Sequence, residues 1–547
     1  MNSQLQAAVF HSVEKIPFAE AGILPSITLE YLTSSRDLEP FFHRRFSDEE
    51  FYSQLLEKKT EYTADRRALL TKVLRRQYDL AGIQLYKSPI LNAQIEALND
   101  DKSFVITTGH QLCLHTGPLY FLYKIISAIA MTRRLKSLYP EYAFIPVFWM
   151  ASEDHDFDEI NHFHHNQVRF QWNLPKHTLP VGRLRMDGYA EVLNAYASFL
   201  RPHNVYTREW LDILADSYLN AHSLKDATRR LVHTLLGHYG VVIVDGDDFE
   251  LKNSFRFLIK NEILHKISSR AVKATSEQIG KLWFAQVHPR DINFFYLSEN
   301  GRFRITKDEN GRYHSDTRVW TESEMEYEIE KHPERFSPDV VTRPLYQEFI
   351  LPNLAYIGGA NELAYWFQLK GLFSAHQVPM PILLLRNSFV MLKKKDLSFF
   401  EKYAVPKSYI FLKTTDALKT LVRKNSPTDA QFDHYVRQIS ELYNKIEQYS
   451  TSIDKTLTGS VLAQKTRHEK ALEKLRNKVL KAEMKRNEWL TQKLLQLRQT
   501  VFPNDVLQER YENAGQYYCQ YGKIWLDQLV QTAEMPTLDV YAVFLSD

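Results

Sequence analysis

The sequence predicts an α/β protein with a parallel sheet, followed by a helical coiled-coil hairpin. Two observations predict the sheet: short apolar runs of strand length alternate with helix-forming stretches, and several runs end at glycine or charged residues. A third observation predicts the hairpin, because after about residue 390 apolar residues recur at spacings of three and four. A chain of 547 residues is too long for one compact core, so its length favours two to four domains.

The composition excludes several classes of protein. A hydrophobic content of 44% and a charged content of 25% are typical of soluble globular proteins. A net charge of +3 gives no reason to expect a nucleic-acid partner, and no apolar run has the ~20 residues needed to span a membrane. The start, "MNSQLQAAVFHSVEK", has no signal-peptide pattern. With only Cys113 and Cys519, neither a disulfide framework nor a multi-cysteine zinc site is possible. We therefore expect a cytoplasmic protein.

Residues 1–100 are expected to form a mainly helical N-terminal part of the core. "SDEEFYSQLLEKK" places Ser47 as an N-cap before acidic residues in the first turn. "RRALLTKVLRRQYDLAG" continues the helical period and ends at Gly82.

The next stretch predicts a strand, a helix and a second strand. "SFVITTGH" (103–110) is a buried-strand candidate closed by glycine, and "AFIPVFWMA" (143–151) is another. Between them, residues 117–140 form a helix with Pro118 in its first turn. Strand, helix and strand within ~45 residues form a βαβ unit, which requires a parallel sheet.

More strands are expected in the sheet-bearing region 101–390, with a helical stretch at 210–240. The further strand candidates are residues 240–248, 293–297, 302–305 and 380–385.

The region after residue 390 predicts two long helices. The first begins with Ser426 as N-cap and Pro427 at N1. Its apolar seam is Phe432, Tyr435, Ile439, Leu442, Ile446, Tyr449 and Ile453. After an interruption at Gly459, the second helix runs from about 461 to 501 and is stopped by Pro503. This pattern indicates an antiparallel coiled-coil hairpin that either packs on the core or pairs between subunits.

The first stretch with chemical potential is "TTGHQLCLHTGPLYFLYK" (107–124), where a strand ends and a helix begins. Gly109 permits a sharp turn, and Gly117 with Pro118 opens a helix whose free N–H groups favour phosphate, with Lys124 two turns in. Neither a GxGxxG nor a Walker A pattern is present, so nucleotide binding and an ordinary turn both stay open. Cys113 is either a nucleophile or a small buried residue.

The second stretch is "SEDHDFDEINHFHHN" (152–166), an acidic cluster directly after a buried strand. Three interpretations compete: a site for magnesium, manganese or zinc; a solvated loop; or carboxylates that grip a substrate amine beside His155. If residues 162–165 are extended, His162 and His164 face one way while Phe163 and His165 face the other.

Two more stretches end at the same expected sheet edge. Arg343 directly precedes Pro344, which disfavours a mid-helix position. Gly358 and Gly359 precede a helix and permit either close approach to a purine or an ordinary tight turn. Arg386 ends a strand, where it suits phosphate or carboxylate recognition, or a surface salt bridge.

Taken together and in order, these stretches resemble one family. "TTGHQLCLHTGPLYFLYKIISAI", "PVFWMASEDHDFDEINH", "VVIVDGDDFELK", "QVHPRDINFFYL", "FSPDVVTRPLYQEFILPNLAYIGG", "ELAYW" and "LQERYEN" are similar to the cysteine ligase family of bacillithiol biosynthesis, the BshC family. The resemblance implies a Rossmann-like core related to class I aminoacyl-tRNA synthetases, with inserted connecting segments at about 175–238 and 275–340. It also implies a coiled-coil domain at 391–510 and a C-terminal segment, 511–547, that packs back on the core.

The resemblance further implies the reaction. Cysteine would be added to the amine of glucosaminyl malate, using ATP or another adenine nucleotide, with or without Mg²⁺, and without zinc. A homodimer through residues 426–501 is implied, with no nucleic-acid or membrane partner. One alternative is a metal-dependent hydrolase that uses the cluster from Glu153 to His165, and another is a non-enzymatic scaffold.

The residues carried over from the family fall into two sets. Those expected to be catalytic are Glu153, Asp154, His155, Asp156, Lys124 and Arg386. Those expected to bind nucleotide or substrate are Thr108, Gly109, His110, Gln111, Gly117, Pro118, Tyr120, Trp149, Arg343, Gln347, Gly358, Gly359, Asn361 and Glu362. The chain departs from the family pattern at His110, where glutamine is expected, and at Asn361 in "GGANE".

Overall fold

The structure is a computed structural model that describes residues 9–175, 177–425, 428–486 and 488–546. Within them the chain forms two compact units. The first unit includes Ile23–Val390 and Gln508–Ser546, and the second includes Met391–Leu507. The expected N-cap Ser426 and its neighbour Pro427, and the first eight residues of the chain, lie outside the described residues.

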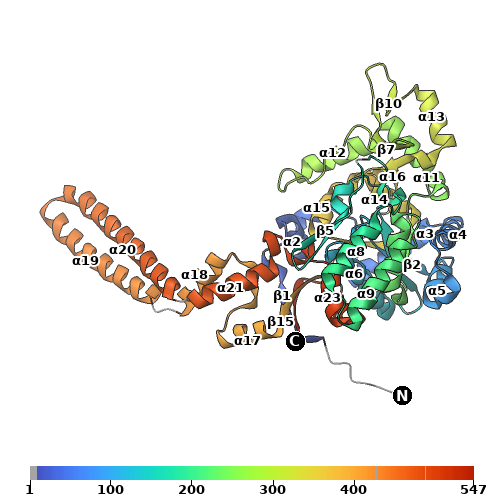
Figure 1. Cartoon of the computed structure of the whole chain (residues 1–547). Helices are drawn as coiled ribbons and strands as arrows, with labels where there is room; N and C mark the ends of the chain where they lie inside the picture. The colour runs from blue at the N-terminus through green and yellow to red at the C-terminus, as the bar shows by residue number, and fades with distance from the viewer. Residues whose placement is uncertain (1–8, 176, 426–427, 487, 547) are drawn as a thin grey trace. The chain divides into compact units, whose positions relative to one another are not determined.

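The first unit is built on a five-stranded parallel sheet (Figure 1). Its strands are β2 (Ser103–His110), β3 (Ala143–Met150), β6 (Val242–Asp245), β13 (Asn353–Gly358) and β14 (Ile382–Leu385). Their spatial order is β14-β13-β2-β3-β6, and each neighbouring pair is parallel. In chain order this arrangement is 3-2-1-4-5 read from β6, the order of a Rossmann sheet. The expected α/β fold with a Rossmann-like parallel sheet is confirmed.

The chain runs outward from β2 in both directions, which fixes where a ligand can bind. From β2 it passes to β3 and β6 on one side, and later to β13 and β14 on the other. The neighbouring strands β2 and β13 therefore form the switch point, and the loops after them diverge to leave a crevice.

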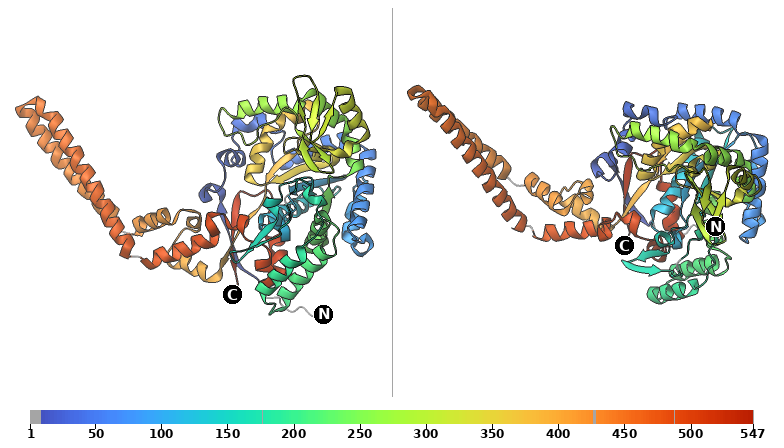
Figure 2. Two further views of the ribbon diagram at one scale, coloured as in Figure 1. Left: turned by 45° about the horizontal axis from the view of Figure 1, so that its top comes forward. Right: turned by 90° about the horizontal axis from the view of Figure 1, so that it is seen from above.

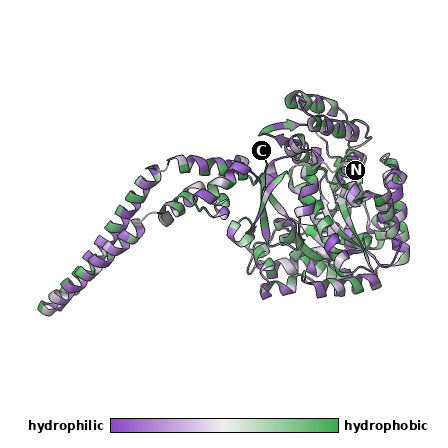
Figure 3. Cartoon of the chain, turned by 90° about the horizontal axis from the view of Figure 1, so that it is seen from below, coloured by the Kyte–Doolittle hydropathy of each residue, from purple (hydrophilic) through white to green (hydrophobic). Residues whose placement is uncertain are grey.

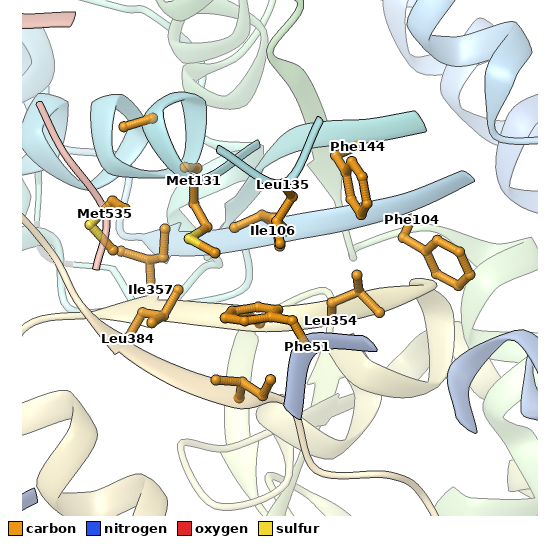
Figure 4. Packing of buried hydrophobic residues seen from close by; sticks show 14 of the residues in the cluster. Phe51, Phe104, Ile106, Met131, Leu135, Phe144, Leu354, Ile357, Leu384 and Met535 are labelled. Carbon is orange, nitrogen blue, oxygen red and sulfur yellow. The ribbon is translucent and has the colours of Figure 1, made fainter. Parts of the chain in front are cut away.

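Helices α3 (Asp48–Glu61) and α6 (Tyr120–Leu138) pack apolar side chains on the sheet (Figure 4). The cluster joins Phe51 of α3, Met131 and Leu135 of α6, Ile106 of β2 and Ile357 of β13. All the strand residues of β2 are buried, in agreement with its apolar run Phe104–Ile106.

The N-terminal helices follow their sequence signals. Ser47 caps α3, since its hydroxyl accepts a hydrogen bond from the Glu50 N–H group. Helix α4 (Ala64–Leu80) ends two residues before Gly82, whose φ of +72° suits glycine. Other helices of the first unit are α2 (Ser26–Leu32), α5 (Pro89–Ala97), α8 (Tyr189–Leu200), α9 (Val205–Leu219), α10 (Leu224–Leu236), α11 (Phe249–His265), α12 (Ile267–Ile279), α13 (Glu322–Lys331), α14 (Arg343–Ile350), α15 (Ala360–Gln368), α16 (Lys370–His376), α22 (Gln508–Tyr511), α23 (Gly515–Tyr521) and α24 (Lys523–Thr532).

Smaller antiparallel sheets accompany the main sheet. The expected strands near 293–305 form not in the parallel sheet but in a separate one, ordered β12-β7-β8. Its members are β7 (Phe294–Ser298), β8 (Gly301–Arg304) and β12 (Phe336–Pro338). The remaining strands are β4 (His162–His165), β5 (Val168–Gln171), β9 (Thr306–Lys307), β10 (Tyr313–Ser315), β11 (Arg318–Trp320), β1 (Phe10–Pro17), β15 (Ser388–Lys393) and β16 (Asp539–Leu545).

The second unit contains the expected helical hairpin. Helices α19 (Thr428–Ile453) and α20 (Thr458–Arg486) lie side by side (Figure 2). The Tyr443 hydroxyl bonds His468 at 2.6 Å, and Arg476 bonds Asp433 at 2.5 Å, so the two helices are antiparallel. The other helices of this unit are α17 (Lys394–Lys402), α18 (Thr414–Asn425) and α21 (Glu488–Val501).

One detail of the hairpin differs from the sequence prediction. Gly459 does not interrupt the helices but lies in the first turn of α20, and the turn falls at Asp454–Leu457, where Asp454 accepts a hydrogen bond from the Thr456 N–H group. A single glycine only lowers helix propensity, whereas a capping aspartate satisfies a free N–H group, so the cap decides the turn.

Among the described residues, none of the helices is long and apolar enough to cross a membrane.

Candidate functional site

A pocket of about 590 Å³ lies at the carboxyl edge of the parallel sheet. Each of the five strands contributes a lining residue at or directly after its carboxyl end. These residues are Gln111 after β2, Ala151 after β3, Gly246 after β6, Gly359 after β13 and Arg386 after β14. The pocket therefore occupies the crevice at the switch point, where open α/β sheets bind their ligands.

Trp149, near the end of β3, lines the pocket because Gly246 leaves room for it. A Cβ atom at Gly246 would lie 2.5 Å from the Trp149 ring. The same ring packs edge-on against Tyr346, with centroids 5.6 Å apart. Gly246 is thus required for the indole to take this place beside the pocket.

One side of the pocket, which we call the α6 wall, consists of Tyr120, Lys124, Glu362, Arg386 and Arg510. Lys124 bonds Glu362 at 2.6 Å and the Gly109 carbonyl at 2.8 Å. Burial lowers the pKa of Lys124, with Glu362 acting in the opposite direction. Burial alone would raise the pKa of Glu362, but Lys124 and the Gly359 N–H group together outweigh it, and the net effect is a lowered pKa. The positive charge of Lys124 is therefore balanced inside the protein.

The positive charge of Arg386 is also balanced by a buried carboxylate. Its two Nη atoms bond the two carboxylate oxygens of Glu509 at 2.5 and 2.8 Å, and both side chains are buried. The Ser388 hydroxyl also donates to Glu509, at 2.6 Å. Among the described atoms, the Arg386 Nε has no hydrogen-bond partner. Such a bidentate ion pair fixes the guanidinium and leaves one donor free.

A second group of lining residues, which we call the β8 wall, consists of His155, Phe295, Arg302 and Arg304. The Arg302 guanidinium lies over the Phe295 ring at 3.9 Å and donates to the Pro338 carbonyl at 2.9 Å. It also lies 3.2 Å from His155 Nδ1. Arg304, which is exposed, stacks on the same ring at 4.9 Å.

Residues of the acidic stretch after β3 also line the pocket. Asp154 accepts hydrogen bonds from the Gln111 amide and the His155 N–H group, both at 2.7 Å. Burial would raise the pKa of Asp154, but hydrogen bonds from His155 and Gln111, and nearby Arg302, leave it well below its usual range. Glu153 forms an ion pair with the buried Lys252. Burial nevertheless raises the pKa of Glu153. Asp156 is exposed.

The metal interpretation of this stretch finds no support. Within the part of the chain that the structure describes, no group of three or more His, Cys, Asp or Glu side chains could hold a metal ion. In β4, Phe163 and His165 are buried while His162 and His164 are half-buried, as the alternation predicted. His165 bonds the Tyr196 hydroxyl at 2.8 Å, and His164 stacks on Tyr511 at 4.2 Å. These histidines are packing residues.

Asp339 is a further carboxyl group in the pocket lining. Its Oδ1 accepts hydrogen bonds from the N–H groups of Val341 and Thr342 at 2.9 and 3.2 Å. Burial raises the pKa of Asp339 to about 6, against the opposing effect of these bonds and of Arg302. Such a carboxyl group is suited to accept a proton near neutral pH.

Neither His110 nor Cys113 is reactive in this structure. Burial, and then Lys124, lower the pKa of His110 to about 3, so the imidazole is neutral. Burial raises the pKa of Cys113 to about 12, so the thiol stays protonated. Of the two alternatives for Cys113, a nucleophile or a small buried residue, the structure supports the second.

The structure brings most of the expected site residues together. Those that line the pocket are His110, Gln111, Tyr120, Lys124, Trp149, Glu153, Asp154, His155, Asp156, Arg343, Gly359, Asn361, Glu362 and Arg386. Those that do not line it are Thr108, Gly109, Gly117, Pro118, Gln347 and Gly358. Thr108 is bonded inside the sheet, where its hydroxyl donates to the Ile357 carbonyl at 2.8 Å. Gln347 is buried beside Glu348.

The expected phosphate cradle at Gly117 and Pro118 is wrong in its geometry. Helix α6 begins at Tyr120, so Pro118 precedes the helix. The N–H group of Leu119 donates to the Glu512 carbonyl at 2.9 Å, and that of Phe121 donates to the Pro118 carbonyl at 3.0 Å. Neither N–H group is free for phosphate, because Glu512 of a segment near the C-terminus occupies the first and the turn itself occupies the second.

Several residues of the pocket have no role predicted from the sequence. Arg302 and Arg304 alternate along an expected strand, a signal that two cations share one face. Arg290, Asp339 and Arg510 also line the pocket. Arg510 stands in "LQERYEN", which belonged to the resemblance but received no function.

Comparisons with known proteins agree with the geometry. A family model described as the N-terminal Rossmann-like domain of bacillithiol biosynthesis BshC matches residues 12–387. A second, described as the C-terminal coiled-coil domain of the same family, matches residues 389–545. The two models together span nearly the whole chain.

Three curated relatives carry the name "Putative cysteine ligase BshC". The protein from Christiangramia forsetii is 38% identical over 526 residues, covering 94% of this chain and 96% of the relative. The protein from Flavobacterium johnsoniae is 37% identical with the same coverage. That from Cytophaga hutchinsonii is 32% identical, covering 97% and 98%. A solved structure described as a putative arginyl-tRNA synthetase from Campylobacter jejuni is 12% identical, covers 81% of this chain and 97% of its own, and has a TM-score of 0.21, too low to support an argument.

Proposed function

The chain belongs to the BshC family of bacillithiol biosynthesis, and from this premise we propose that it is a ligase that joins cysteine to the amine of glucosaminyl malate. One observation supports this proposal best: the pocket at the switch point combines cationic side chains for anionic groups with carboxylates suited to an amine. An ATP-dependent ligation of an amino acid to an amino sugar that carries carboxylates needs both cationic and carboxylate side chains.

Formation of an amide from a free carboxylate requires activation. We propose that ATP converts the cysteine carboxylate to an adenylate or an acyl phosphate, with Mg²⁺ supplied together with the nucleotide phosphates. The glucosamine nitrogen then attacks the acyl carbon, a C–N bond forms, and the C–O bond to phosphate breaks. Because the reaction consumes ATP, we also propose a cytoplasmic location.

The pKa shifts suggest different roles for two pocket carboxyl groups. Asp154 has a lowered pKa and stays ionised, so it is suited to bind the cysteine ammonium group. Asp339 has its pKa raised to about 6, so it is suited to take the proton that the attacking amine releases. That Glu153 or Asp156 accepts the proton of the attacking amine stays a prediction.

The two carboxylates of the malate group require cations. Our first candidate is Arg343, one of the expected binding residues, which lines the pocket with one Nη 3.3 Å from the Tyr365 hydroxyl. We add Arg304 and Arg290, which are exposed at the pocket, whereas Arg302 is largely committed to protein acceptors. Lys124, Arg386 and the other residues of the α6 wall are proposed to face the nucleotide.

The proposal is tested by incubating the purified protein with ATP, cysteine and glucosaminyl malate and following the products by mass spectrometry. We expect bacillithiol together with either AMP or ADP, and the nucleotide product identifies the activated intermediate. The proposal fails if no amide forms in vitro and a strain that lacks the gene still makes bacillithiol.

We also propose that the protein is a homodimer through the coiled-coil hairpin. In the isolated chain, Tyr435, Leu442, Tyr449 and Ile453 of the seam are 45–71% exposed. Figure 3 shows apolar residues distributed along both helices of the hairpin among polar ones. A seam of large apolar side chains at heptad spacing favours burial against a second copy.

A further inference from the structure

The segment Gln508–Asn513 supports the pocket from the far end of the sequence. The Asn513 amide donates to the carbonyls of His115 and Gly117 at 2.7 and 2.8 Å, and the Glu512 carbonyl accepts from Leu119. These contacts hold the turn that begins α6. The backbone of this turn is unusual, because His115, Thr116 and Gly117 all have positive φ.

The charges of the α6 wall are unevenly balanced. Lys124 is paired with Glu362, and Arg386 is paired with Glu509, so each of these cations has a carboxylate of its own. Arg510 differs from both. It is exposed, it lines the same pocket, and within the described chain it makes no ion pair within 4 Å. The uncompensated positive charge of this wall is therefore on Arg510.

The position of Arg510 is set by Tyr120. The Arg510 guanidinium lies 5.6 Å from the Tyr120 ring centre, and that of Arg386 lies 5.3 Å from it. Stacking on an aromatic ring orients the planar guanidinium and leaves its N–H groups available at the ring edge.

A second observation indicates that an acceptor is missing beside Arg510. The Arg386 Nε atom is buried and has no partner among the described atoms, although both Nη atoms of this guanidinium are bonded to Glu509. It lies 3.8 Å from the place that a Cβ atom on Gly359 would take. A buried N–H donor without an acceptor is costly, so a ligand oxygen near Gly359 would satisfy it.

We propose that Arg510 binds the phosphate chain of the nucleotide, with Arg386 Nε as a second donor to the same group. This inference rests on the proposed use of ATP. Phosphate is favoured over the malate carboxylates because the α6 wall adjoins the ends of β2 and β13 at the switch point, where Lys124 bonds the Gly109 carbonyl and Glu362 accepts from the Gly359 N–H group. The cations of the β8 wall are proposed to bind the carboxylates, because Arg302 contacts His155 of the acidic stretch instead.

Glu509 and Asn513 are then positioning residues. Glu509 fixes the Arg386 guanidinium, and Asn513 fixes the turn before α6 that carries Tyr120. Neither lines the pocket.

The test is a binding measurement on the full-length protein, independent of turnover. Isothermal titration calorimetry with ADP and with a non-hydrolysable ATP analogue compares the unaltered protein with R510A and R510K. We expect R510A to weaken binding about tenfold to hundredfold, as expected for lost charge-assisted hydrogen bonds. R510K should lose less, because it keeps the charge but not the planar fork.

Two control variants make the result specific. R208A removes an exposed arginine on α9 outside this pocket and should leave nucleotide affinity unchanged. R304A, on the β8 wall, should leave nucleotide affinity unchanged but weaken binding of glucosaminyl malate. Circular dichroism confirms that each variant is folded.

The possible outcomes separate this inference from the proposed function. If the unaltered protein makes bacillithiol but R510A binds nucleotide normally, the inference is wrong and the function stands. If R510A loses nucleotide binding but no bacillithiol forms, the inference stands and the function is wrong. If R510A instead loses only glucosaminyl malate, Arg510 binds a carboxylate and the inference is overturned. The absence of any nucleotide binding by the unaltered protein also overturns it.

Discussion

Glu348 shows how a single buried carboxyl group can make stability depend on pH. It is fully buried in α14, where its Oε1 accepts hydrogen bonds from Gln347 and Asn353 and its Oε2 has no partner among the described atoms. Burial raises the pKa of Glu348 to about 7, with Lys58 acting in the opposite direction. Because no described group donates a hydrogen bond to Oε2, a negative charge on this carboxyl group is poorly stabilised and the protonated form is favoured.

We therefore predict that E348Q stabilises the protein at pH 8 but not at pH 4. The folded state binds the proton more tightly than the unfolded state, so stability falls as pH rises from about 4.5 to about 7. Glutamine has no charge to bury, and the gain at pH 8 is up to about 3 kcal/mol. Urea unfolding at both pH values measures it.

E277Q is the matched control, because Glu277 is exposed. An equal gain in E277Q at pH 8, or a gain in E348Q at pH 4, would contradict the assignment of this pH dependence to Glu348.

Individual site residues were predictable where a local pattern places them at a strand end. Gln111, Asp154, Gly359 and Arg386 follow strands that contain short apolar runs, so their shared edge could be predicted. Arg510 was not predictable in this way. It reaches the pocket from a segment more than 120 residues beyond β14, and no local pattern encodes such a contact.

At the scale of elements, the β2–α6–β3 unit followed the sequence except at the start of its helix. Pro118 predicted a first turn, but the chain there bonds with Glu512 and Asn513. Tertiary hydrogen bonds thus override a local preference. Gly117 has φ +56° and ψ −141°, a conformation that suits glycine alone, and a Cβ atom there would lie 2.5 Å from Cys113 Cβ.

G117A is accordingly expected to destabilise the first unit by at least about 1–3 kcal/mol, the cost of a strained backbone conformation. The matched substitution G459A lies in α20 with nothing within 4 Å of the added methyl group. It should stabilise the second unit by about 0.5–1 kcal/mol through helix propensity. Scanning calorimetry measures both, and a neutral G117A would disprove the requirement for glycine.

The antiparallel sheet that carries the β8 wall shows a different limit of sequence reasoning. Its strands are expected near 293–305, within the inserted segment implied at about 275–340, but their pairing with Phe336–Pro338 in an antiparallel sheet is not. Apolar period and turn residues reveal that a strand exists, whereas its partner depends on contacts distant in sequence. For this reason the cations of the β8 wall were missed while their strand was found.

At the scale of the whole molecule, the proposed dimer gives a direct prediction. The double variant L442E/Y449E places charges at two exposed seam positions and should convert the protein to a monomer. Burying two carboxylates in a helix pair costs far more than the seam gains, so the change should be complete at micromolar concentration. Analytical ultracentrifugation measures the mass.

R437E introduces the same side chain at an exposed polar position of α19 and should leave the mass unchanged. A monomeric unaltered protein would refute the dimer outright, and a dimeric L442E/Y449E would place the interface elsewhere.

The ion pair between Arg386 and Glu509 joins two residues 123 positions apart, one just before the chain leaves the first unit and one just after it returns. Both chain ends that flank Met391–Leu507 are thereby held in the first unit. We therefore predict that the first unit can fold without this segment. Replacing Lys394–Leu507 by a flexible linker of about ten residues should yield a folded miniature core. Calorimetry should show that this shortened protein still binds nucleotide. If it fails to fold, the first unit requires the inserted segment for its stability.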